Sequence, residues 1–183
     1  MRLFLILIVS LWHAAAPLQA AEKTIAPDWT LNTPDGQPVN LQATAKEQTT
    51  VILFWATWCP YCKALMPHLQ SIRLEYGESV RILAVSIKED GDPVEFVASA
   101  GYDFTVLPDG DAVADLYDVR GTPGVFVIDQ ERAIRFDLRK LPRIEPPDIG
   151  KSASNSRKAA FRAPYWAAEI RKSIDAVASA ASQ

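Results

Sequence analysis

The chain contains very little cysteine and histidine, with two residues of each in 183 positions. So few soft ligands leave little material for a metal centre, and a framework of structural disulfides needs more than one pair of cysteines. The sequence also lacks internal repeats and a GxGxxG motif for a flavin or nicotinamide cofactor. Its net charge of −3 gives no reason to expect nucleic acid as a partner.

Hydrophobic residues make up 49% of the chain and charged residues 22%, which is typical of one globular domain. The first twenty residues differ from the rest: Arg2 precedes an apolar stretch from Leu3 to Trp12, and the small residue Ala20 follows. This pattern predicts a secretory signal peptide over residues 1–20 and a single domain over 21–183. The apolar stretch is shorter than the roughly 20 residues that span a bilayer, although an uncleaved N-terminal anchor stays an alternative. We therefore expect an exported, periplasmic protein.

The two cysteines, Cys59 and Cys62, lie in the sequence Trp58-Cys59-Pro60-Tyr61-Cys62. Two thiols at this spacing close a small ring and can cycle between dithiol and disulfide. The apolar run Val51–Trp55 predicts a strand, and apolar residues at helical spacing within Lys63–Tyr76 predict a helix. Cys59 then lies at the start of that helix, where unpaired N–H groups and the helix dipole favour a thiolate. We expect Cys59 to be the nucleophile and the more shielded Cys62 to be the resolving thiol.

Two other interpretations of this cysteine pair stay open. A CxxC pair also occurs in zinc sites, which need four ligands, and His68 is the one further soft ligand after the leader. Alternatively, the chain is a binding module that does not turn over its cysteines.

The remaining pattern alternates between strand and helix, which predicts an α/β fold with a central sheet covered by helices. We expect strands at Val80–Ser86, Val125–Asp129 and Ala133–Leu138, and helices at Asp92–Ala100, Ala112–Tyr117 and from Trp166 to Val177.

Four local motifs carry a resemblance to a known family. They are Ala26–Leu31 with Asp35–Val39, the segment Phe54–Cys59, the proline Pro67 five residues after Cys62, and Gly121-Thr122-Pro123. Over about residues 26–181 the chain resembles the TlpA/ResA-like family of exported, thioredoxin-fold thiol-disulfide oxidoreductases. The resemblance implies a thioredoxin-like three-layer sandwich with a mixed sheet, an N-terminal hairpin and a central insertion. The 64 residues from Cys59 to Pro123 are consistent with that insertion.

The resemblance also implies a substrate platform. In the family, the peptide bond before the proline of the last motif is cis and faces the dithiol, so Thr122 and Pro123 would offer main-chain groups to a client strand. Trp58, Pro60 and Tyr61 would form the rest of the client-binding surface. The alternative is an ordinary trans turn proline between glycines.

This chain differs from plain thioredoxins in the group that could accept the proton of the second thiol. Plain thioredoxins carry a buried acid where this chain has Leu53, whereas the TlpA-like family uses a glutamate after the next strand, and Glu89 falls at that place. We expect Glu89 to have a raised pKa beside buried sulfur and to act as general base for Cys62. Alternatively, Glu89 is a solvated loop charge beside Asp90 and Asp92.

The chain also differs from the family in a basic stretch rich in proline and serine, which we predict to be a loop over residues 140–163. Its local charge of +4 suggests docking of an acidic partner or lipid headgroups, and the alternative is a mobile, solvated loop. The charged residues are Lys140, Arg143, Lys151, Arg157, Lys158 and Arg162 against Glu145 and Asp148.

The resemblance favours a reductase of exported protein disulfides, of the type that serves cytochrome c maturation or metal-site assembly. Its expected partners are exported protein thiols and a membrane thiol electron donor, with no cofactor beyond the Cys59–Cys62 disulfide.

A disulfide oxidant or isomerase is the main alternative, because Pro60-Tyr61 and Thr122 are similar to residues of glutaredoxins and periplasmic isomerases. Such isomerases carry a separate dimerisation domain, for which the few residues between Ala20 and Pro27 leave no room. A peroxiredoxin is a more distant alternative, since Ala56 stands where that family needs threonine.

Overall fold

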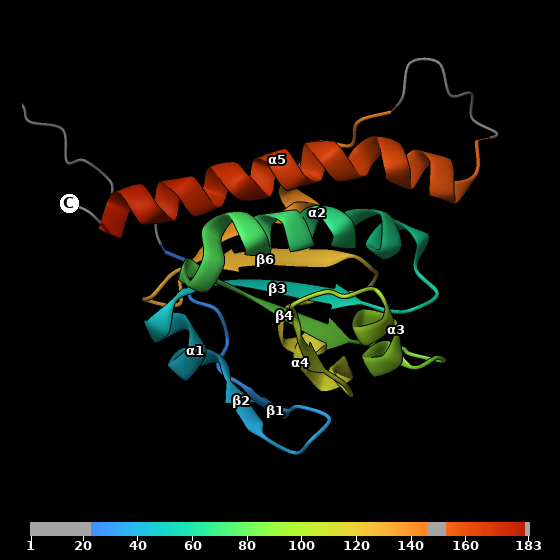
Figure 1. The fold of residues 1–183 in the computed structure, drawn as a ribbon. Coiled ribbons are helices and arrows are strands. Elements are labelled where there is room, and N and C mark those ends of the chain that lie inside the picture. The colour runs from blue at the N-terminus through green and yellow to red at the C-terminus, as the bar shows by residue number, and fades with distance from the viewer. Residues whose placement is uncertain (1–22, 146–152, 182–183) are drawn as a thin grey trace, which may run out of the picture.

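A fully buried strand, β3 (Thr49–Trp55), forms the centre of the sheet in the computed structural model, which describes residues 23–145 and 153–181. Its neighbours are the parallel strand β4 (Val80–Ser86) and the antiparallel strand β6 (Gly124–Ile128). The short strands β5 (Thr105–Leu107) and β7 (Ile134–Asp137) complete the order β5-β4-β3-β6-β7 (Figure 1). A strand that is covered on both faces reads as a continuous apolar run, as β3 does.

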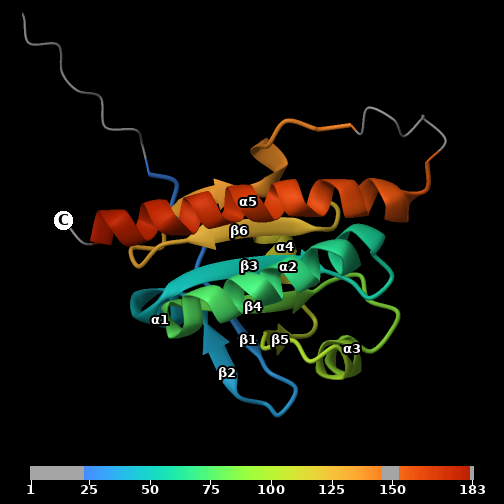
Figure 2. The ribbon, with the colours of Figure 1, turned by 45° about the horizontal axis from the view of Figure 1, so that its top comes forward.

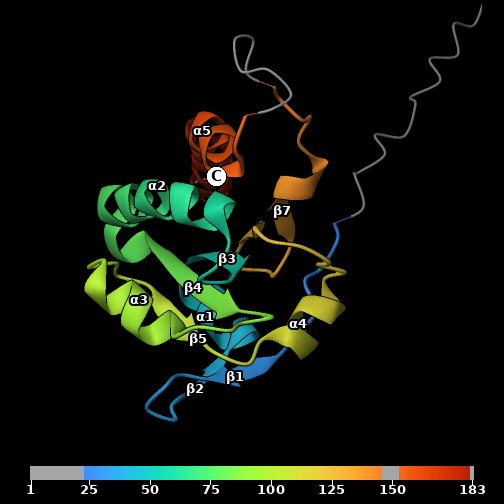
Figure 3. The ribbon, with the colours of Figure 1, turned by 90° about the vertical axis from the view of Figure 1, so that its right-hand side faces the viewer.

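Helices cover both faces of this sheet, which confirms the predicted thioredoxin-like three-layer arrangement (Figure 3). Alternate residues of β3 point to opposite faces and divide the core in two. Leu53 and Trp55 pack with α2 (Pro60–Tyr76) and α5 (Asn155–Ala181), whereas Phe54 packs on the other face. The remaining elements are α1 (Leu41–Glu47) and α4 (Asp111–Leu116) on the Phe54 face, α3 (Pro93–Ser99) beside the α2 face, and the 3₁₀ turns η1 (Gly77–Ser79) and η2 (Leu138–Lys140).

The predicted N-terminal hairpin forms a separate two-stranded sheet of β1 (Thr30–Asn32) and β2 (Pro38–Asn40), which projects from the main sheet (Figure 2). Its turn needs Gly36, whose φ of 82° lies in the left-handed region. Trp29 ties the hairpin to the domain because its indole N–H donates to the Tyr117 hydroxyl at 3.1 Å.

The predicted strands and helices are all present, but the prediction of a loop over 140–163 is wrong at its C-terminal end. Residues Asn155–Ala163 belong to α5, which begins well before the expected start at Trp166. The hydroxyl of Ser154 accepts a hydrogen bond from a main-chain N–H of the first turn, as a helix N-cap does. Small side chains at Ala159 and Ala163 are fully buried, so this part of the helix packs into the domain.

The predicted signal peptide at 1–20 and part of the basic stretch, at 146–152, lie outside the described residues. Within residues 23–145 and 153–181, no helix is both long and apolar enough to span a bilayer.

Candidate active site

The cysteine pair lies where β3 passes into α2. Cys59 is the N-cap of α2, Pro60 is the first helical residue, and the two cysteines form a disulfide with their Cα atoms 5.3 Å apart. The Cys62 main-chain N–H donates to Cys59 Sγ at 3.1 Å. When the pair is reduced, this N–H and the helix dipole favour a thiolate on Cys59.

Both cysteines are buried in this oxidised form. Cys59 is 2% exposed and Cys62 is 0% exposed, so the difference in shielding that the sequence predicted is small here. The accessible rim comes from their neighbours: Trp58 is 48% exposed, and Pro60 and Tyr61 are half-buried. The Trp58 indole N–H donates to the Lys88 carbonyl at 2.8 Å, which holds the exposed ring in place.

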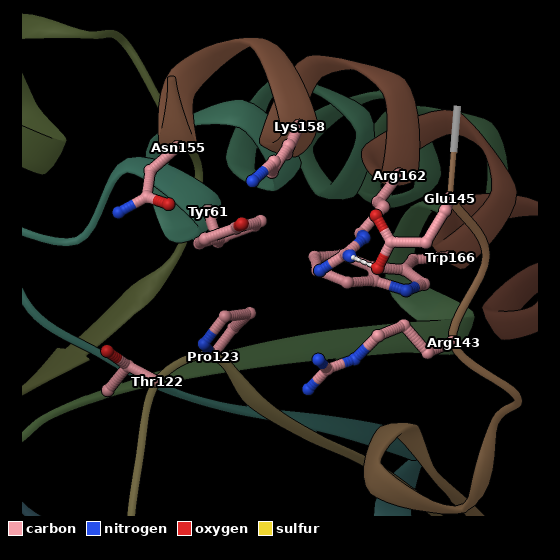
Figure 4. Close-up of a pocket in the computed structure, with 9 residues that line it drawn as sticks. All are labelled: Tyr61, Thr122, Pro123, Arg143, Glu145, Asn155, Lys158, Arg162 and Trp166. Carbon is pink, nitrogen blue, oxygen red and sulfur yellow. Dashed lines mark hydrogen bonds and ion pairs between the residues drawn. The ribbon is translucent and has the colours of Figure 1, made fainter. Parts of the chain in front are cut away.

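The Thr122–Pro123 peptide bond is cis, as the family resemblance implied. It immediately precedes β6, whose first residue, Gly124, pairs with Phe54 near the end of β3. The cis proline and the dithiol therefore lie at the same end of the sheet. Tyr61, between the two cysteines, and Thr122-Pro123 line one common cavity (Figure 4).

Glu89 lies in the loop after β4, and its carboxylate accepts hydrogen bonds from the chain that leads to Cys59. Both the main-chain N–H and the hydroxyl of Thr57 donate to it, the former at 2.9 Å. Further donors are the Ser86 hydroxyl at 3.2 Å and the main-chain N–H groups of Asp90 and Gly91 at 3.1 and 3.0 Å. Neither cysteine is among its hydrogen-bond partners.

The expectation of a raised pKa for Glu89 is wrong in this form of the protein. Burial by itself raises the pKa of Glu89, but the hydrogen bonds from Thr57, Gly91 and Asp90 outweigh it and hold the pKa below the usual 4.5. The carboxylate is thus ionised at neutral pH and braces the loop before Cys59.

We expect Glu89→Gln to lower the free energy of unfolding by about 1 kcal/mol at pH 7, because an amide accepts these hydrogen bonds less strongly. Since the folded-state pKa of Glu89 is lowered, its ionised form stabilises the fold above the unfolded pKa. That stabilisation is lost as the pH falls through the folded pKa, so the deficit of the variant should shrink below about pH 4. Urea unfolding at several pH values measures this.

Asp90→Asn is the matched control, because the Asp90 side chain receives none of the hydrogen bonds of this loop. A deficit in Glu89→Gln that is the same at pH 3 and pH 7 would contradict the bracing by an ionised carboxylate. The same variant tests the role as base, since an unchanged pH profile of client reduction would rule out proton transfer from Cys62.

The sequence singled out the basic stretch that contains Arg143, Lys158 and Arg162, but it did not place these residues beside Tyr61 and Pro123, where they complete the wall of a cavity. They come from the segment after η2 and from the first turns of α5. Arg162 and Trp166 contact Tyr61 directly, with Arg162 5.6 Å from the centre of the tyrosine ring and the two aromatic ring centres 6.1 Å apart. The one signal for them in the sequence was the positive charge of the stretch.

No group of three or more His, Cys, Asp or Glu side chains in the described ranges has the arrangement to hold a metal ion. A CxxC disulfide at a helix N-terminus, beside a cis proline at the same end of a mixed sheet, defines this chain as a thioredoxin-like domain with a redox-type cysteine site. The AhpC/TSA family model matches residues 23–137, more than half of the chain. The protein therefore belongs to the AhpC/TSA family.

Comparison with similar proteins confirms the predicted relationship to the TlpA/ResA-like family. The chain is 29% identical over 114 residues to the thioredoxin-like protein YneN of Bacillus subtilis, a match that covers 60% of this chain and 66% of YneN. It is 32% identical over 114 residues to the thiol-disulfide oxidoreductase ResA of the same organism, covering 61% of this chain and 63% of ResA. The chain thus spans less than two thirds of the length of these relatives.

Solved structures share the fold of this chain. A putative thiol:disulfide interchange protein DsbE from Chlorobium tepidum superposes with a TM-score of 0.57 at 28% identity, covering 64% of this chain and 84% of that one. A hypothetical protein from Sinorhizobium meliloti 1021 covers 86% of this chain and 84% of its own, with a TM-score of 0.63. At 22% identity, the latter match supports the fold alone.

Proposed function

We propose that this protein is a thiol-disulfide oxidoreductase that reduces disulfides of exported proteins. The observation that carries the proposal is the Cys59–Cys62 disulfide at the start of α2, beside the cis Thr122–Pro123 bond. Similar proteins carry the names thiol-disulfide oxidoreductase ResA and thiol:disulfide interchange protein DsbE, which supports thiol-disulfide exchange as the chemistry of this chain. Cytochrome c maturation or metal-site assembly is the proposed setting, in the periplasm.

The reaction uses both sulfurs in turn. In the reduced protein, the Cys59 thiolate attacks a client disulfide, forms a mixed disulfide and releases one client thiolate. The Cys62 thiolate then attacks Cys59 Sγ, which forms the Cys59–Cys62 disulfide and releases the second client thiolate. Two electrons pass from the protein to the client, and the client thiolates take up protons from solvent.

Client binding is assigned to the surface around the disulfide. The exposed Trp58 ring and the half-buried Pro60, Tyr61 and Pro123 form an apolar rim around the pair. An extended client segment would pair with the main chain of Thr122, as a strand added to a sheet edge does.

After each cycle, two electrons from outside the chain must reduce the Cys59–Cys62 disulfide back to the dithiol. We propose a membrane thiol electron donor as their source, with thiol-disulfide exchange as the chemistry. No further cofactor enters the proposed cycle.

The reduction potential of the Cys59–Cys62 couple tests the direction of electron flow. We expect about −270 mV, the value of a thioredoxin-like reductant, from equilibration of the protein in glutathione or dithiothreitol buffers and counting of free thiols. A value near about −120 mV would instead assign the protein to the oxidants or isomerases that Pro60-Tyr61 suggests.

A further inference from the structure

A cavity of about 410 Å³ lies beside Tyr61 of the CxxC sequence, between the cis-proline loop and the first turns of α5 (Figure 4). Part of its wall is the site already described: Tyr61 comes from the CxxC sequence, and Thr122 and Pro123 from the platform. The rest of the wall is mostly polar and consists of Arg143, Glu145, Asn155, Lys158, Arg162 and Trp166.

The charge of this wall is positive although the protein as a whole is acidic. Among the described residues that line the cavity, there are three cations, Arg143, Lys158 and Arg162, and one carboxylate, that of Glu145. The net charge of the whole chain is −3. In Figure 4 the Lys158 and Arg143 side chains approach the hollow from opposite sides, one from α5 and one from the segment below it. Such a focused positive potential attracts anions.

Arg162 keeps this wall in place. Its side chain is 12% exposed, and it donates to the Ile144 carbonyl at 3.1 Å and to the Glu145 carboxylate at 2.5 Å. Because its guanidinium also lies over the Tyr61 ring, it connects the segment after η2, helix α5 and the CxxC sequence. Arg162 and the parts of the wall that it connects are therefore held in place in the free protein, which lowers the cost of ordering them when a ligand binds.

Arg143 is the cation that is most available to a ligand. It is exposed, and the described residues offer it no ion pair. An arginine that is not already paired can bind a carboxylate with two parallel hydrogen bonds.

We propose that this cavity binds an acidic side chain of the client, an aspartate or glutamate close to the cysteine under attack, and so selects clients by charge. The inference rests on the proposed function and names its substrate class. A client disulfide that reaches Cys59 must place its flanking residues against Tyr61 and Pro123, and these two residues line the same cavity as the cations.

The geometry favours a polypeptide over lipid headgroups. A membrane surface is flat and would meet outward-facing charges, whereas these cations line a hollow together with Tyr61 and Pro123. Recognition here is useful to the reaction because it raises the rate of encounter and orients the client disulfide.

The test uses two peptides with the same single disulfide, one with glutamate and one with glutamine on either side of a cysteine. We would measure the second-order rate constant for reduction of each peptide by the pre-reduced protein. We expect the wild type to prefer the glutamate peptide by about threefold to tenfold at low ionic strength, and the preference to fall towards one in 0.5 M salt.

In the double variant Arg143→Gln/Lys158→Gln, the preference should drop to about twofold or less. The ratio of the two rate constants is the readout, so any general loss of activity cancels. Lys46→Gln is the matched control: it removes one exposed positive charge from α1, which precedes the start of β3, while the dithiol follows the end of that strand. Its preference should equal that of the wild type.

The outcomes separate the inference from the proposed function. If the wild type reduces neither peptide, the proposed function fails. Equal rates with both peptides, or a preference that survives in the double variant, would overturn charge selection and leave the function standing. Sedimentation with phosphatidylglycerol vesicles that is lost in the double variant, together with equal peptide rates, would assign the cations to a membrane surface instead.

Discussion

Replacing Cys59 with serine is expected to reduce the rate of client disulfide reduction by a factor on the order of 10³ or more. The Cys59 sulfur is the one at the helix N-cap that accepts a hydrogen bond from the Cys62 N–H, so we expect it to carry the thiolate that attacks the client. A serine hydroxyl does not ionise near neutral pH and cannot form a disulfide. The loss is measured as the rate at which insulin or a disulfide peptide is reduced while the supply of reductant is held constant.

The matched variant Cys62→Ser should attack clients normally and then stall. Without the second thiol, the mixed disulfide on Cys59 is not resolved and clients accumulate as covalent adducts. Non-reducing electrophoresis and mass spectrometry of these adducts would identify the clients, and the double serine variant shows the background.

Two results would contradict these roles. Adducts that form on Cys62 in Cys59→Ser, and not on Cys59 in Cys62→Ser, would reverse the order of attack. A Cys59→Ser protein that keeps its full cellular role would show a binding module that uses the platform without redox turnover.

Phe54→Ala is expected to lower the free energy of unfolding by about 3–5 kcal/mol, the largest effect on stability that we predict. Phe54 is fully buried, and its ring centre lies 5.4 Å from that of Tyr117 and 6.0 Å from that of Phe126. Truncation leaves a cavity in this core, directly beside Gly124 and the start of β6. Urea unfolding monitored by circular dichroism measures the loss.

Leu74→Ala is the control for this change, because Leu74 is 71% exposed on α2 and should cost less than about 0.5 kcal/mol. A loss of under about 1 kcal/mol in Phe54→Ala would mean that the surrounding side chains collapse into the space. The side chains on this face of the sheet would then repack more readily than their burial indicates.

Local patterns in the sequence predicted most of the fold because they reflect local causes. The buried run before Cys59 and the helical spacing after it specify a strand, a turn and a helix, and the structure has β3 and α2 in these places. Among the α-helices and strands, the sequence missed α1 and β5, which are seven and three residues long. Length alone does not explain this, because α4 has only six residues and was predicted. The helix-start signal for α1 was Asn40, whose side chain caps the helix by accepting a hydrogen bond from the Ala43 N–H.

The environment of Glu89 was decided by the tertiary structure. From the sequence, a carboxylate near buried sulfur suggested a raised pKa, but β3 and β4 lie side by side and bring the Thr57 N–H and hydroxyl onto it from 32 positions away. These donors reverse the direction of the pKa shift. No sequence pattern contains this information, because it depends on how two loops meet at the end of the sheet.

The sequence by itself determined the chemistry of this protein: one cysteine pair, its spacing, and its place at the start of a helix. The tertiary structure alone decided what surrounds that pair. Packing of α5 against α2 places Arg162 and Trp166 on Tyr61, about a hundred residues earlier in the chain. The physical reason is range, since a thiolate is favoured by the first turn of its own helix, whereas a charged cavity needs side chains that only the folded chain brings together.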